Sequence, residues 1–345
     1  MAAESRGGAP GLGTGKLPPD LLRSLILDRL RVRRPETIVH AALGVDAAAV
    51  DFGGWACVLK TDPITTATAG AGRLAVTVAC NDLAAMGAEP IGVLPTLLFP
   101  AGITPDAIAA LVDEIDAATR ALQVEVLGGH TEVAPGLVAP LVVMSAVGRA
   151  RPDRLVSAAG ARPGDDLVLT KAAALEGTAI LADDFAQHLA PLVDARLLEE
   201  ARRYRDELSV VPEGLAAAER GATAMHDPTE GGVLGALWEL GEASGTGFTV
   251  DRERIPIRAP THAICTALAV DPLRLIASGA LLIACPDGRR LAGELGELGI
   301  EATVIGRVTD ASAGRHLVDA DGSLAPVGPV GRDELYRLIE AASAG

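Results

Sequence analysis

The order of apolar and polar positions predicts alternating strands and helices along most of the chain. Apolar runs between Gly and Pro residues predict strands at 55–61, 91–99, 124–127, 137–147, 166–170, 248–250, 280–284, 302–308 and 316–319. Helical spacing of apolar residues predicts helices at 20–30, 105–122, 176–189, 195–205, 212–220, 232–243 and 262–268, the end of another at 78–87, and a last one from 332. Such alternation is typical of an α/β or α+β fold.

A stretch rich in Arg, Pro and Gly at residues 151–164 separates two mixed halves. A chain of 345 residues is long enough for two domains, each with its own core. We expect a flexible N-terminus with the first helix at 1–34, an N-terminal domain at 35–155 and a C-terminal domain at 160–345.

The glycines before Lys16 resemble a phosphate-binding loop, but the segment fails the test for one. Leu17 stands where Ser or Thr is required, and no strand precedes the glycines. Two interpretations remain open: a disordered tail, or a flap that closes Lys16 over a ligand.

Composition and charge restrict the class of partner. A net charge of -15 and an aromatic content of 2% argue against nucleic acid or an anionic membrane as partner. The N-terminus lacks a secretory pattern and no apolar run reaches the ~18 residues of a membrane helix, so we expect a cytoplasmic protein. Cys57, Cys80, Cys265 and Cys285 are far apart, which predicts neither a zinc site nor a disulfide framework.

Asn81 and Asp82 are the most unusual pair, because they interrupt a predicted helix of small apolar residues. Both side chains compete for backbone hydrogen bonds and so cost stability inside a helix. Asp82 either lies on a solvated face or is buried, and a buried carboxylate needs a partner. A hard cation such as magnesium, which takes oxygen ligands, would account for the pair.

Other polar residues stand at the margins of predicted strands. Asp46 follows a turn, and Asp62 precedes a proline where the chain is expected to turn away. His130 follows Gly128 and Gly129, which leave room for a ligand near the backbone. Each residue taken alone is more typical of an ordinary turn or loop than of a ligand site.

Residues 225–233 form a second unusual segment. Thr229 is a good cap for the helix that follows, and the first N–H groups of a helix attract anions. A cap does not explain Gly231 and Gly232, because glycine lowers helix propensity.

Six motifs, in this order and spacing, resemble the aminoimidazole-ribonucleotide-synthetase-like (PurM-like) superfamily over about residues 16–338. They are Gly44-Val45-Asp46-Ala47-Ala48-Ala49-Val50, Lys60-Thr61-Asp62-Pro63, Asn81-Asp82-Leu83-Ala84-Ala85-Met86-Gly87-Ala88, Gly128-Gly129-His130-Thr131-Glu132, Pro163-Gly164-Asp165 and Asp227-Pro228-Thr229-Glu230-Gly231-Gly232. Within it the chain resembles the hydrogenase-maturation carbamoyl dehydratase and the proteins known as AIR-synthase-related.

The resemblance implies an N-terminal mixed-sheet domain that dimerises through its strands, a C-terminal α/β domain, and ATP with Mg2+ in the cleft between them. It implies that the metal carboxylates are Asp46, Asp62, Asp82 and Asp227. It implies nucleotide contacts from Asn81, Gly128, Gly129, Thr131, Thr229, Gly231 and Gly232. Beside the resemblance, we predict catalytic roles for Lys16, as part of a flap over the ligand, and for His130, as a proton carrier near neutral pH.

The implied reaction moves the γ-phosphoryl group of ATP to a carbonyl or amide oxygen of an unknown acceptor, small or protein-borne. The alternatives are a small-molecule kinase like thiamine-monophosphate kinase and an ATP-binding assembly protein without catalysis. The sequence departs from the family in His130, where the family has an acidic residue, and in Glu230, where the dehydratase has Arg. The dehydratase's C-terminal cysteine and the N-terminal cysteine of selenophosphate synthetase have no counterpart in residues 340–345 and 1–16.

Overall fold

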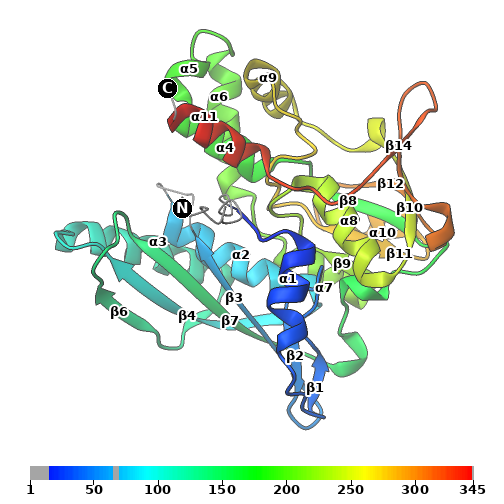
Figure 1. Cartoon of the computed structure of the whole chain (residues 1–345), viewed down its shortest axis with the longest axis horizontal. Helices are drawn as coiled ribbons and strands as arrows, with labels where there is room; N and C mark the ends of the chain where they lie inside the picture. Colours follow the sequence, from blue (N-terminus) through cyan, green and yellow to red (C-terminus); the bar gives the residue numbers. More distant parts are fainter. Residues whose placement is uncertain (1–14, 65–69, 344–345) are drawn as a thin grey trace, which may run out of the picture.

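The computed structural model describes residues 15–64 and 70–343 and contains two parts, each built on one sheet (Figure 1). The strands of the first part are β1 (Thr37–Val39), β2 (Ala48–Asp51), β3 (Ala56–Ile64), β4 (Glu89–Phe99), β5 (Glu125–Val126), β6 (His130–Val133) and β7 (Leu141–Ala150). Its helices are α1 (Pro19–Leu25), α2 (Ala71–Ala85) and α3 (Pro105–Leu122). The sheet order is β1-β2-β3-β7-β4-β5, and β6 also pairs with β4.

The second part carries the remaining elements. Its strands are β8 (Asp166–Thr170), β9 (Ala224–His226), β10 (Gly247–Asp251), β11 (Leu282–Cys285), β12 (Ala302–Thr309), β13 (Arg315–Val318) and β14 (Leu324–Pro326), in the sheet order β14-β13-β10-β12-β8-β11-β9. Its helices are α4 (Leu175–Asp184), α5 (Ala186–Leu189), α6 (Ala195–Arg203), α7 (Val211–Glu219), α8 (Gly232–Ser244), α9 (Ala259–Leu268), α10 (Gly288–Gly296) and α11 (Glu334–Ser343). The predicted two-domain α/β architecture is confirmed.

Helix α2 lies at the centre of the molecule and packs against strands β3 and β7, helix α3 and helix α7 of the second part (Figure 1). Its small side chains allow this close packing, and 13 of its 15 residues are buried. Asp82 is only 3% exposed, which excludes the solvated-face interpretation. Its carboxylate must therefore find partners inside the protein.

The opposite face of the first sheet is less covered. Residues that point away from α2, such as Leu59, Leu94, Val143 and Val147, are half-buried or exposed. This face therefore presents apolar side chains at the surface.

Three sequence predictions about local structure are wrong. The first helix ends at Leu25 and a 3-10 turn follows, with no residue of either buried, so the predicted apolar side contacts no core. Strand β3 continues through Asp62, which is paired opposite Met144 and does not stand at a turn. His130 begins strand β6 and is not in a loop. Residues 1–14 of the predicted flexible start lie outside the described residues.

Over residues 15–64 and 70–343, no helix has both the length and the apolar character needed to cross a membrane.

Candidate functional site

A cavity of about 1080 Å3 lies where the two parts meet. Six of the residues singled out in the sequence line it: Lys16, Asp46, Asp62, Asp82, Asp227 and Thr229. They come from the N-terminal segment, the turn before β2, strand β3, helix α2 and the loop after β9. The structure thus gathers polar groups from distant parts of the sequence around one space.

Lys60 joins two of the predicted carboxylates. Its Nζ atom lies 3.1 Å from Oδ2 of Asp82 and 3.2 Å from Oδ2 of Asp62. Burial opposes the charge on Lys60, but Asp82 and Asp62 outweigh it and raise the pKa of Lys60. Burial raises the pKa of Asp82 well above its ordinary value, against the lowering effect of Lys60. Lys60 therefore holds these carboxylates together at the cavity wall.

His226 bridges two further carboxylates. Its Nδ1 atom lies 2.6 Å from Oδ1 of Asp46, and its Nε2 atom lies 2.8 Å from Oε2 of Glu239 on helix α8. Burial alone would lower the pKa of His226, but Asp46 and Glu239 raise it to about 10. Burial alone would raise the pKa of Glu239, but Lys16 and His226 lower it to about 2. The two carboxylates thus favour the charged imidazolium form of the buried His226 side chain.

Gly44 allows the turn that carries Asp46 to approach helix α8. Its φ is +69°, and a Cβ atom there would lie 2.5 Å from the carbonyl oxygen of Glu239. Only glycine accommodates both the backbone conformation and this contact.

Asp227 has the least satisfied carboxylate of the site. It is 1% exposed, and neither oxygen has a hydrogen-bond partner among the described residues. Burial raises its pKa, and Asp46 adds to the effect. Oδ2 of Asp46 and Oε2 of Glu176 are also buried without a hydrogen-bond partner in the described part of the chain. Such groups are costly unless a ligand satisfies them.

The carboxylate oxygens of Asp227 and Asp46 fit a magnesium ion. Magnesium prefers oxygen ligands and is usually held by one or two carboxylates together with substrate phosphates and water. Within the described residues, no three His, Cys, Asp or Glu side chains form a ready-made metal cage. The donors present therefore suit an ion that arrives with a phosphate-bearing ligand.

Glu176 stands on the first turn of α4 and also lines the cavity. Burial raises the pKa of Glu176 to about 7, against the lowering effect of a hydrogen bond with Ser278. The sequence pattern predicts a site role for none of Glu176, Glu239, Lys60 and His226. The sequence does offer a signal for Lys60 and His226. Lys60 stands two residues before the predicted ligand Asp62, and His226 directly precedes the predicted ligand Asp227.

Asn81 does not face the cavity as a ligand. Its amide nitrogen donates to the carbonyl oxygen of Leu208 at 2.8 Å, and its amide oxygen accepts from the backbone N–H of Val210 at 2.8 Å. Asn81 is fully buried. This bonding corrects the expectation of a nucleotide contact, because the side chain links α2 to the second part.

The structure does not bring the second glycine motif to the cavity. Gly128, Gly129, His130 and Thr131 are exposed and lie at strand β6 beside β4. Nε2 of His130 lies 3.0 Å from Oε2 of Glu132. None of these four residues lines the 1080 Å3 cavity of the described chain, so its geometry gives no support to their expected nucleotide and catalytic contacts.

Gly231 and Gly232 also have another explanation than phosphate binding. The N–H of Gly231 donates to Oδ2 of Asp333 at 2.7 Å, and that of Gly232 donates to the carbonyl oxygen of Thr229 at 3.0 Å. A Cβ atom on Gly232 would lie 2.6 Å from the carbonyl oxygen of Leu273. A carboxylate of the chain itself thus takes the position expected for a phosphate.

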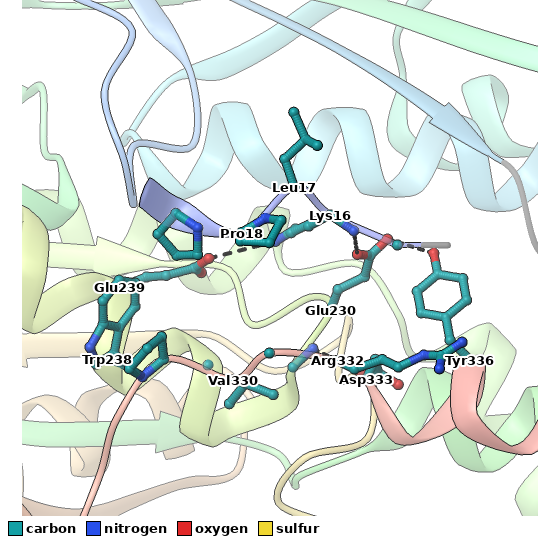
Figure 2. A pocket seen from close by; sticks show the side chains of 16 residues that line it. Lys16, Leu17, Pro18, Glu230, Trp238, Glu239, Val330, Arg332, Asp333 and Tyr336 are labelled. Atoms are coloured by element: carbon teal, nitrogen blue, oxygen red, sulfur yellow. Dashed lines mark hydrogen bonds and ion pairs between the residues drawn. The ribbon is translucent and has the colours of Figure 1, made fainter. Parts of the chain in front are cut away.

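Lys16 lines the 1080 Å3 cavity and also a smaller neighbouring pocket, which Figure 2 shows. Nζ of Lys16 donates to Oγ1 of Thr229 at 3.2 Å and lies 3.7 Å from Glu239, while its backbone N–H donates to Glu230 at 3.2 Å. Figure 2 also shows the Tyr336 hydroxyl donating to Glu230, at 2.7 Å. Glu230 therefore receives hydrogen bonds from both ends of the described chain.

Two family models match the chain. The N-terminal domain of AIR synthase related protein matches residues 44–150, and its C-terminal domain matches residues 162–319. Together they cover well over half of the 345 residues. The chain belongs to the AIR synthase related protein family, which confirms the superfamily predicted from the motifs.

Individual relatives point to the hydrogenase-maturation branch. A putative hydrogenase expression/formation protein of Methanocaldococcus jannaschii is 28% identical over 334 residues, covering 88% of this chain and 94% of that protein. The carbamoyl dehydratase HypE of Azotobacter vinelandii is 31% identical over 253 residues, covering 69% of each. A crystal structure of the hydrogenase maturation protein HypE in complex with ATP shares the fold, with a TM-score of 0.67 and 22% identity over 92% of this chain and 96% of that one.

Proposed function

We propose that this protein binds ATP with magnesium in the 1080 Å3 cavity and transfers the γ-phosphoryl group to a carbonyl or amide oxygen of an acceptor. The observation that carries the proposal is the buried Asp227 carboxylate, whose two oxygens lack partners in the described chain, beside the unpartnered oxygen of Asp46. The ATP complex of HypE and the dehydratase named for the Azotobacter relative support it.

The residues of the cavity have three different roles in this proposal. Asp46, Asp62, Asp82 and Asp227 would hold the magnesium, which supplies positive charge to the phosphate oxygens when bound. Lys60 and His226 keep these carboxylates in place through their ion pairs. Lys16 lines the cavity beside Thr229, and its ammonium group would bind a phosphate oxygen.

The proposed step conserves atoms and charge. The acceptor oxygen forms a bond to the γ-phosphorus, the bond from that phosphorus to the β,γ-bridging oxygen breaks, and ADP leaves with the electron pair. The phosphate on the acceptor then serves as leaving group for dehydration. A phosphorylated product that persists would instead identify a kinase.

Calorimetric titration of ATP, with and without magnesium, tests the proposal on wild type, Asp227→Asn and the surface control Asp116→Asn. We expect magnesium-dependent binding by wild type and control, and at least a ~100-fold loss, or about 2.7 kcal/mol, in Asp227→Asn. Phosphate release assayed on the same samples reports turnover. Unchanged ATP affinity in Asp227→Asn would remove this carboxylate from the site.

We also infer a homodimer that buries the open face of the first sheet. Leu59, Val143 and Val147 present apolar side chains there, and such faces mark association sites. Sedimentation should give a particle of twice the 35.1 kDa chain mass. Val147→Lys should dissociate it, while Val112→Lys on helix α3 should not, and a wild-type monomer at micromolar concentration would refute the inference.

A further inference from the structure

A second cavity, of about 310 Å3, lies between helices α2 and α4 beside the larger one. The two cavities share the side chains of Leu74 and Glu176, so they meet at this point. The volume is at the lower end of the range that small-molecule sites occupy. The second cavity is thus large enough for a small reactant next to the proposed ATP site.

The Glu176 side chain marks this junction as a place for a ligand. It is 4% exposed, and its Oε2 atom has no hydrogen-bond partner among residues 15–64 and 70–343. An N–H or O–H group of a bound molecule would satisfy that oxygen and recover the cost of burying it. This observation is independent of the carboxylates assigned to magnesium.

The charges around the second cavity indicate which ligand it would take. The two arginines in its wall are already neutralised, because Arg73 pairs with Asp206 and Arg205 pairs with Asp183. The wall also holds Asp184 and Glu114, and no lysine or histidine belongs to its described lining. A phosphate or carboxylate group would therefore meet no unpaired cation there, whereas a neutral hydrogen-bond donor would meet acceptors.

We propose that the second cavity is the acceptor site of the reaction, and that it takes a small neutral primary amide whose N–H group donates to Glu176. This inference rests on the proposed function, since it places the acceptor of that reaction. Glu176 is a binding residue in this arrangement. Its position between the cavities would direct the amide toward the ATP side.

Saturation-transfer NMR with propionamide and its anionic isostere propionate tests the site. We expect a saturable propionamide signal at least ~3-fold stronger than that of propionate. The signal should disappear in Glu176→Leu, which removes the hydrogen-bond acceptor, and in Ile180→Trp, which fills the cavity from helix α4. Val112→Trp, with its new indole on the surface of α3, should retain the signal.

An equal signal from propionate, no saturable propionamide signal, or a signal that survives in Ile180→Trp would overturn the proposal. Titration of ATP on the same samples separates the two hypotheses. Wild type that binds ATP but not propionamide refutes only the acceptor site. Wild type that binds no ATP refutes the proposed function.

Discussion

Replacement of Glu176 by Gln should change how stability depends on pH. Burial raises the pKa of the Glu176 carboxyl from 4.5 to about 7. Because the folded protein then binds the proton more tightly than the unfolded chain, this carboxyl lowers the free energy of unfolding as pH rises from 4.5 toward 7. Each unit of difference between the two pKa values corresponds to about 1.4 kcal/mol, so the free energy of unfolding should fall by about 3 kcal/mol by pH 8.

The Glu176→Gln variant keeps the size of the side chain but cannot ionise. Unfolding in urea without nucleotide, at pH 4.5 and at pH 8, measures the free energy of unfolding of both proteins. Relative to wild type, the free energy of unfolding of the variant should rise by about 3 kcal/mol between these two pH values. Glu219→Gln, at an exposed position of helix α7, should follow wild type at both pH values. Parallel pH profiles for wild type and Glu176→Gln would refute the reasoning that burial raises this pKa.

Three further predictions address the site and its supports. His226→Gln should lower the free energy of unfolding by about 3–5 kcal/mol in urea, because it leaves the buried Asp46 carboxylate without its cation, while the exposed His188→Gln should not. Asn81→Leu should cost about 2–4 kcal/mol in the same assay, because two backbone groups lose their partners, and a cost below about 0.5 kcal/mol would contradict the linking role. His130→Ala should change ATP affinity and turnover by less than about 2-fold, and a 10-fold fall in turnover would return this residue to the active site.

The pattern of apolar residues was sufficient for the main elements, because periodicity reports which side of an element faces the core. The surroundings of Asp82 also pointed to burial, since its neighbours offer almost no polar face. Neither the bridge from Asp46 through His226 to Glu239 nor the pair of Lys60 with Asp82 could be predicted in this way. Their members are brought together by tertiary packing alone.

The glycine pair at 231–232 shows a second limit. Glycine permits a ligand to approach the backbone, but it equally permits one backbone to approach another. The sequence pattern is the same in both cases. Here Gly232 packs against the backbone of Leu273, and the N–H group of Gly231 donates a hydrogen bond to Asp333.

The position of helix α2 restricts how a nucleotide can enter and leave. Asn81 ties this helix to the backbone at Leu208 and Val210, and Gly214 of helix α7 lies so close that a Cβ atom would be 2.3 Å from the carbonyl oxygen of Ala84. A hinge opening of the two parts would break these contacts beside Asp82. Exchange of a nucleotide would therefore depend on movement of the segment at Lys16, which lines the cavity and is held by hydrogen bonds to Thr229 and Glu230.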